Sequence, residues 1–170
     1  MQDHVDFVVG QWGKAMPELD ASSMEVFGRM LRLLKHLAKV RAQAMAPFGF
    51  REGEFDVLAT LRRAGEPYSL SPTQLYKSLL ITSGAMTNRL NHLEQQGLIA
   101  RISDPDDKRS TRVSLTPHGR RLIEQALVVH TATQNRLLEN LSLAQREQLG
   151  SLLRQVLLTF PAEEIATDTQ

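Results

Sequence analysis

The sequence predicts a mainly helical protein of the α+β class. Apolar residues recur at three- and four-residue spacing over most of the 170 residues, which is the periodicity of amphipathic helices. A capping residue followed by proline occurs at Ser71-Pro72 and at Thr116-Pro117, and this pairing is typical of a helix start. Two short strand-like segments, 98–103 and 111–115, lie between the helical stretches and predict one hairpin.

The N-terminal part predicts two helices. The first runs from about Val5 to Ala15 and ends near Pro17, and residues 20–23 then supply capping groups for a second helix over 23–45. The second helix is apolar over so much of its circumference that it requires partners on more than one side. The apolar residues at helical spacing are Met24, Phe27, Met30, Leu31, Leu34, Leu37 and Ala38.

The middle of the chain predicts three shorter helices. One spans about 52–63, after the break at Pro47 and Gly49. The next spans 72–79, and a third begins at Thr82 or Ser83 and stops at Gly97. Glycines and prolines between these segments predict tight turns.

After the hairpin, whose connection 104–110 is polar and rich in turn residues, two more helices are predicted. Thr116 caps one that runs to about Asn140, and Ser142 caps the last, which carries an apolar stripe from Leu149 to Phe160. The expected organisation has four parts. They are an N-terminal and dimerisation segment 1–46, a lobe 47–116, C-terminal dimerisation helices 117–160 and a polar tail 161–170.

Charge is distributed unevenly along the chain. Lys and Arg total 20, Asp and Glu total 19, and the formal net charge is +1. Segments 31–63 and 71–121 each carry +4, whereas both ends are acidic. A basic surface of this kind is compatible with phosphate binding, although an ordinary solvated face gives the same pattern.

Several classes of function are excluded by missing residues. There is no cysteine, which excludes a disulfide framework, a zinc ribbon and a thiol nucleophile. The five histidines show no compact ligand spacing, so no metal site is expected, and no nucleophile motif, phosphate loop or other cofactor motif is present. No apolar run reaches the length of a membrane span, and the N-terminus lacks a signal peptide, so a cytoplasmic location with no membrane partner is expected.

Helix, tight turn, helix and hairpin in that order form a winged helix–turn–helix, in which the second helix fits the major groove of DNA. The candidate DNA-binding residues on its first two turns are Ser83, Ala85, Thr87, Asn88 and Arg89. At the hairpin tip Lys108 and Arg109 are expected to enter the minor groove, with Asp107 orienting Arg109. A helical hairpin without a ligand, and a mobile charged hairpin, remain the alternatives.

Two stretches resemble the MarR family of transcriptional regulators. Asp104-Pro105-Asp106-Asp107-Lys108-Arg109, followed by Val113-Ser114-Leu115-Thr116 and Gly119, resembles the wing of that family. Residues 84–90 and 93–99 resemble its recognition helix and the exit from it. The resemblance covers most of residues 22–160. It implies a homodimer, formed by the N- and C-terminal helices, that binds a palindromic operator in double-stranded DNA.

A narrower resemblance lies in the N-terminal helix with Trp12, in Leu19-Asp20, in Met24-Glu25-Val26 at the start of the second helix and in Phe55-Asp56-Val57-Leu58. These segments resemble the urate-responsive branch of the family. The resemblance implies a ligand pocket formed by Trp12, Asp56, Arg89 and Arg101, in which an arginine pair binds a planar anion and the indole stacks on it. Urate, hydroxynicotinate and benzoate-type acids would satisfy the same groups. Each residue also has a simpler interpretation: a packing anchor for Trp12, a surface or paired charge for Asp56, a solvent-facing side chain for Arg101 and a phosphate contact for Arg89.

We therefore expect a dimeric, sequence-specific DNA-binding regulator, a repressor released by a small aromatic acid or a purine. Activation, which depends on operator position, is the alternative mode. A winged helix that docks a protein without binding specific DNA is the main alternative from another class. An enzyme has no candidate catalytic residues here, and the missing cysteine disfavours a redox or metal sensor.

Overall fold

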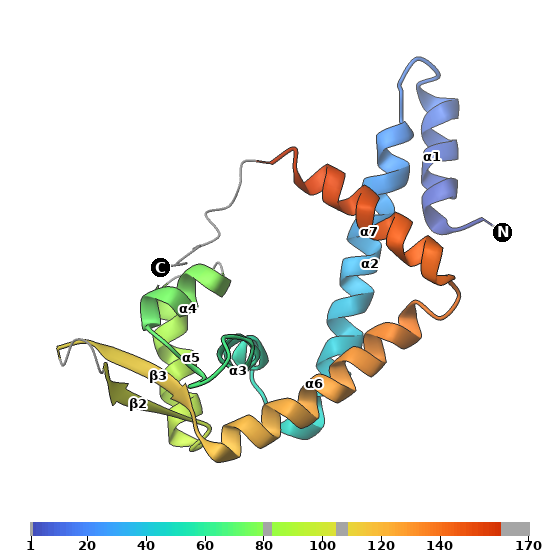
Figure 1. Ribbon diagram of the computed structural model, residues 1–170. Coiled ribbons are helices and arrows are strands. Elements are labelled where there is room, and N and C mark those ends of the chain that lie inside the picture. The colour runs from blue at the N-terminus through green and yellow to red at the C-terminus, as the bar shows by residue number, and fades with distance from the viewer. Residues whose placement is uncertain (1, 80–82, 105–108, 161–170) are drawn as a thin grey trace. The chain divides into compact units, whose positions relative to one another are not determined.

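The computed structural model describes residues 2–79, 83–104 and 109–160, and the side chains of 83–85 lie outside this description. Residues 1–44 and 45–170 form two compact units, and each is considered by itself. Figure 1 labels the helices and strands. Within the described residues no helix has both the length and the apolar character needed to cross a bilayer.

The first unit consists of α1 (His4–Ala15) and α2 (Ser22–Met45), whose last residue already belongs to the second unit. A capping box between Asp3 and Asp6 starts α1. Val5 is buried against Gly28 of α2, where an added Cβ would lie 3.1 Å from the Val5 side chain. Arg29 pairs with Asp3 at 2.9 Å and with Asp6 at 2.6 Å, so the cap of α1 is also its link to α2.

The second unit carries the remaining elements. In chain order they are η1 (Ala46–Phe48), α3 (Glu54–Arg63), β1 (Ser69–Leu70), α4 (Pro72–Leu79), α5 (Ser83–Gln95), β2 (Ile99–Ser103), β3 (Thr111–Leu115), α6 (Pro117–Leu137) and α7 (Leu143–Leu157). The three strands form an antiparallel sheet in the order β1-β3-β2. Ile99 pairs with Leu115 at one end of the hairpin, and Ser103 pairs with Thr111 at the other.

The core of the second unit lies around α3, which packs against α4, α5, α6 and β3. Leu58 and Leu61 of α3 are fully buried, and each neighbouring element contributes apolar side chains to the same core. These side chains are Leu75 of α4, Leu90 and Leu93 of α5, Ile99 of β2, Val113 of β3, and Ile123 and Ala126 of α6. Burial of these groups holds the helix–turn–helix and the hairpin on one scaffold.

The hairpin is joined to α6 by a close backbone contact. Thr116 caps α6 by accepting a hydrogen bond from the Gly119 backbone N–H at 3.0 Å, and its hydroxyl donates to the Gly97 carbonyl at 2.7 Å. A Cβ on Gly119 would lie 1.9 Å from the Leu98 carbonyl oxygen. Glycine at 119 therefore lets α6 begin directly against the base of the hairpin.

The predicted fold class is confirmed, and the predicted helices and strands are present among the described residues. The third helix begins at Glu54 and not at Glu52, because Gly53 adopts a left-handed conformation with a φ of 77°. The sixth helix ends at Leu137, three residues before the predicted Asn140, since residues 138–141 form turns before the next cap. The helix η1 and the two-residue strand β1 were not predicted from the sequence, and the tail 161–170 lies outside the described residues.

Candidate nucleic-acid interface

Helices α4 and α5 form the helix–turn–helix. The capping box that starts α4 is present: the Ser71 backbone N–H donates to Gln74 Oε1 at 2.9 Å, and the Gln74 N–H donates to Ser71 Oγ at 3.1 Å. Met86, Leu90 and Leu93 bury one side of α5 in the core. Thr87, Asn88, Asn91 and Gln95 are exposed on the opposite side, and we call these four the outer face of α5.

The outer face includes two of the predicted DNA-binding residues, Thr87 and Asn88. It also includes Asn91, which was not among the predicted residues because it lies beyond the first two turns of the helix. The spacing of 87, 88 and 91 places them on one side of a helix, and this pattern could have identified Asn91. Ser83 and Ala85 were also predicted to contact DNA, but their side chains lie outside the described part of the chain.

Arg89 lies on a different side of α5 from the outer face. A Cβ built on Gly53 would lie 2.3 Å from Arg89 Cζ, so the guanidinium lies over the N-terminus of α3. This approach requires glycine at 53, which also adopts a left-handed φ.

A second contact joins α5 to α3 one turn further along. His92 Nδ1 lies 2.5 Å from Glu54 Oε1, and Glu54 also accepts a hydrogen bond from the Arg51 backbone N–H at 2.8 Å. Glu54 is almost completely buried. Because a buried carboxylate requires hydrogen-bond partners, this pair is a specific constraint on the position of α5 relative to α3.

Arg101 of β2 contacts α5 on the side facing the hairpin. Its guanidinium forms an ion pair with Glu94, and Nη2 donates to Asn91 Oδ1 at 2.7 Å. At 3.6 residues per turn, Arg89 is roughly 140° around the helix axis from Glu94 and roughly 160° from Asn91. The structure therefore places Arg89 and Arg101 against different sides of α5.

The base of the wing is held by Arg112 of β3. Its guanidinium donates to Ser69 Oγ at 2.8 Å, to the Ser69 carbonyl at 3.0 Å and to Asp104 Oδ2 at 3.2 Å. Beyond this base, Arg109 is exposed, as a DNA-contacting residue must be. The predicted partners Asp107 and Lys108 lie outside the described residues.

The four predicted ligand-binding residues are distributed over both units. Trp12 lies on α1 in the first unit and is 38% exposed. Asp56 lies in the first turn of α3, the end of that helix over which Arg89 lies. Arg101 is engaged with Glu94 and Asn91. The second unit thus brings Asp56 and Arg89 to one end of α3 and holds Arg101 elsewhere.

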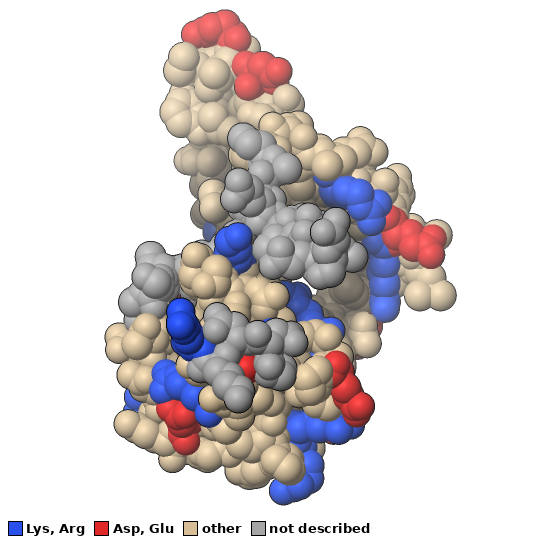
Figure 2. Space-filling view, turned by 60° about the vertical axis from the view of Figure 1, so that its left-hand side comes forward, with Lys and Arg blue, Asp and Glu red and all other residues tan. Residues whose placement is uncertain are grey.

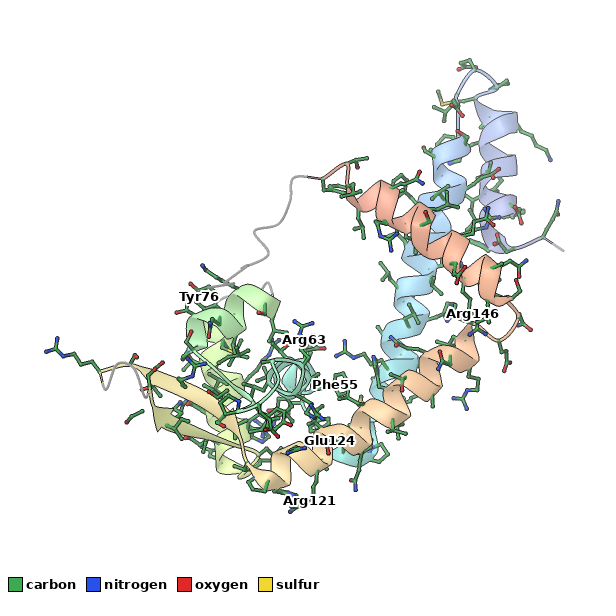
Figure 3. All side chains as sticks on the ribbon, viewed as in Figure 1. Phe55, Arg63, Tyr76, Arg121, Glu124 and Arg146 are labelled. Atoms are coloured by element: carbon green, nitrogen blue, oxygen red, sulfur yellow. The ribbon has the colours of Figure 1, made fainter. Side chains whose placement is uncertain are left out.

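An ionic cluster stabilises the scaffold behind the interface. Glu124 of α6 accepts hydrogen bonds from Arg62 at 2.7 Å and from Arg120 at 3.1 Å (Figure 3 labels Glu124). The hydrogen bond from Arg120, followed by that from Arg62, lowers the pKa of the Glu124 carboxyl. Both guanidinium groups also lie within 5.0 Å of the centre of the Tyr68 ring.

Basic side chains are distributed over the lobe that carries the helix–turn–helix. On the face shown in Figure 2, Lys and Arg side chains are spread over the lower lobe with a few acidic side chains among them. No group of three or more metal-ligating side chains is found among the described residues. An exposed polar helix face beside a basic hairpin fits a polyanionic duplex.

Comparison with known proteins identifies the relatives of this chain. A profile of the MarR family matches residues 48–110. The HTH-type transcriptional regulator PecS of Dickeya dadantii (strain 3937) is 34% identical over 152 residues, which cover 89% of this chain and 92% of PecS.

Two similar solved structures concern DNA binding. A mutant of MarR from E. coli, complexed with operator DNA, has a TM-score of 0.66 at 26% identity and covers 86% of this chain and 97% of that one. BpsR of Bordetella bronchiseptica, in a structure that concerns regulation of its DNA binding by 6-hydroxynicotinic acid, has a TM-score of 0.63 at 27% identity. That match covers 76% of this chain and 91% of BpsR.

Proposed function

Because the chain belongs to the MarR family of helix–turn–helix transcriptional regulators, we propose that it represses transcription as a homodimer bound to a pseudo-palindromic operator. A small planar aromatic anion releases the repressor from that operator. The protein is a DNA-binding regulator and not an enzyme. It acts where the DNA is, in the cytoplasm.

The observation that carries the operator proposal is the outer face of α5. Thr87, Asn88 and Asn91 are exposed together on a helix whose other sides are held by the core, by α3 and by β2. Small polar side chains on an exposed helix can contact base edges and phosphates in the major groove. Arg109, exposed beyond β3, supplies a cation for the neighbouring minor groove.

The dimer proposal is supported by apolar side chains that neither unit covers by itself. Phe27, Leu31 and Leu34 of α2 are exposed, as are Leu152 and Leu157 of α7. A second copy of the chain would remove these side chains from water. Two symmetry-related lobes would then match two half-sites about one helical turn apart.

Operator binding is tested by selecting duplexes from a random library with the full-length protein. The selected sequences are expected to contain an inverted repeat, and fluorescence anisotropy should show tighter binding to it than to a scrambled duplex. The affinity should also fall steeply as salt is raised, because phosphate contacts release counterions. Equal affinity for the selected and the scrambled duplex at physiological salt would contradict sequence-specific repression.

The effector proposal is supported by Arg89, whose guanidinium lies over the N-terminus of α3 beside the turn that carries Asp56. A planar carboxylate or urate matches the fork of a guanidinium. Regulation of BpsR by 6-hydroxynicotinic acid is consistent with this class of ligand.

Urate and 6-hydroxynicotinate are the probes that test the effector. Either should raise the melting temperature of the protein and weaken its binding to the selected duplex. Asp56→Ala should reduce both responses, because the Asp56 carboxylate is proposed to belong to the ligand site. Wild-type ligand affinity in Asp56→Ala would remove Asp56 from the site, and no response to either acid would contradict the proposed ligand class.

A further inference from the structure

Three side chains are joined where β2 meets α5. Arg101 of β2 donates from Nη2 to Asn91 Oδ1 at 2.7 Å and forms an ion pair with Glu94 through Nη1. The Arg101 backbone N–H also donates to Glu94 Oε1 at 3.3 Å. The Arg101 side chain is therefore held at both ends of its guanidinium fork, and one of the groups that it holds is the amide of Asn91.

This arrangement determines which way the Asn91 amide faces. A guanidinium has only donors, so the atom of Asn91 that faces Arg101 must be the acceptor Oδ1. The amide nitrogen is consequently on the other side and presents its two N–H groups away from Arg101. Free asparagine could rotate its amide by 180°, whereas Asn91 in this contact cannot do so without losing its hydrogen bond.

Asn91 lies on the outer face of α5, one turn beyond Thr87 and Asn88. Residues three and four apart are neighbours on a helix surface, so the Asn91 amide extends the same polar stripe toward the hairpin. A helix docked in the major groove through Thr87 and Asn88 would bring Asn91 close to the DNA as well.

We propose that Asn91 is a DNA contact that donates hydrogen bonds, and that Arg101 is the positioning residue that orients it. The acceptor on DNA is a guanine N7 or O6, a thymine O4 or a phosphate oxygen. The two-point contact that asparagine makes with adenine uses both amide atoms, so here Oδ1 would have to accept from Arg101 and from the base together; the two amide N–H groups face away from Arg101 and make the contact that we propose. This inference rests on the proposed operator binding and assigns Arg101 to the DNA interface.

Asn91→Asp and Asn91→Ala test the contact. Aspartate has nearly the same shape and still accepts from Arg101, but it has no N–H to donate and brings a negative charge toward the DNA. We expect each variant to bind the selected duplex about 5- to 100-fold more weakly than wild type, the range for one base contact. Asn135→Ala, an exposed asparagine on α6, is the control and should bind like wild type.

The scrambled duplex distinguishes the two kinds of acceptor. If Asn91 contacts a base, affinity falls for the selected duplex and not for the scrambled one; if it contacts a phosphate, both fall alike. Either result supports the proposal. Wild-type affinity of Asn91→Ala for both duplexes, in a variant with unchanged circular dichroism and dimer mass, would overturn it.

Arg101→Met tests the positioning role. It should weaken binding to the selected duplex without any effector present, and the double variant with Asn91→Ala should lose no more than Asn91→Ala alone, because the two act through one contact. Arg101→Lys, which keeps a donor, should restore part of the affinity. Wild-type DNA affinity in Arg101→Met would overturn the positioning role, and loss of only the urate response would assign Arg101 to the effector site.

Binding by the wild-type protein distinguishes a failure of the proposed Asn91 contact from a failure of the proposed operator binding. If wild type binds the selected duplex and Asn91→Ala binds equally well, the Asn91 contact is wrong and operator binding stands. If wild type shows no preference for any duplex, both fail.

Discussion

Gly119 shows how one side chain sets the relation between two elements. Its missing Cβ leaves room for the Leu98 carbonyl, which would otherwise lie 1.9 Å from that atom. The contacting atom belongs to the backbone, so no side-chain rotation can relieve the clash. The hairpin and α6 can keep their present positions only with glycine at 119.

Gly119→Ala should therefore destabilise the protein by about 1–3 kcal/mol, the usual cost of overpacking. Urea denaturation followed by circular dichroism measures the change. Gly150→Ala on α7 is the matched control, since nothing lies within 4 Å of its Cβ position. The free energy of unfolding of Gly150→Ala should be up to about 1 kcal/mol higher than that of wild type, because alanine has a higher helix propensity than glycine. Equal stability of Gly119→Ala and wild type would contradict the close contact.

Arg109→Ala tests the tip of the wing. Loss of one cation near the DNA should weaken binding to the selected duplex and reduce the salt slope of log affinity by about 1, with the dimer intact. Fluorescence anisotropy over a salt series makes this measurement. Arg63→Ala, an exposed arginine at the end of α3, is the control. An unchanged affinity in Arg109→Ala would remove Arg109 from the interface.

Some individual residues of the candidate site could be proposed from the sequence. Thr87 and Asn88 were proposed because polar side chains on the first two turns of the second helix can contact DNA, and both are exposed in the structure. Arg89, on the same two turns, contacts Gly53, which is distant in sequence. Its direction depends on where α3 lies, and helical periodicity alone does not contain that information.

Among the elements, α3 and α6 are joined by the Arg62–Glu124–Arg120 cluster. The pKa of Glu124 is lower in the folded state than its ordinary value, so folding favours the ionised carboxylate. This contribution to stability is present above the ordinary glutamate pKa. It is lost as the pH falls through the lowered pKa of the folded state.

Glu124→Gln should consequently be less stable than wild type at pH 7, because Arg120 and Arg62 lose their carboxylate partner. The difference in urea midpoint should shrink below about pH 4.3, where glutamate in the unfolded chain becomes protonated. Since the Arg62 and Glu124 side chains are 33% and 39% exposed, solvent screens the pair and the effect is expected to be modest. If the difference in urea midpoint between Glu124→Gln and wild type stayed constant down to pH 3, the charge of Glu124 would not be the cause of that difference.

The elements themselves were mostly predictable from local signals. The Ser71–Gln74 box, the Thr116 cap and the Ser142 cap each mark a helix start that the structure contains. β1 was missed because two residues are too few to show an alternating pattern. Ser69 and Leu70 are a strand only because they pair with Ser114 and Val113 of β3.

For the whole molecule, the unpaired apolar surface of α2 leads to a prediction about assembly. Leu31 and Leu34 are 68% and 61% exposed in a single chain. Replacing both with lysine should prevent the dimer, because charged side chains would be buried at the interface. Light scattering should then give the monomer mass, and affinity for the selected duplex should collapse. Lys35→Ala, on the same helix, is the control, and a double variant that remains dimeric would contradict the proposed interface.

The sequence by itself determined the order and type of nearly all elements, together with the resemblance of the wing and recognition helix. Helix periodicity, caps and turn residues act over a few positions, so they can be recognised in a single sequence. Only the tertiary structure decided which neighbour each side of α5 faces. It placed Arg89 over Gly53, His92 on Glu54, and Asn91 against Arg101. These contacts depend on how α3 and β2 pack around the helix, and packing joins residues that no local pattern connects.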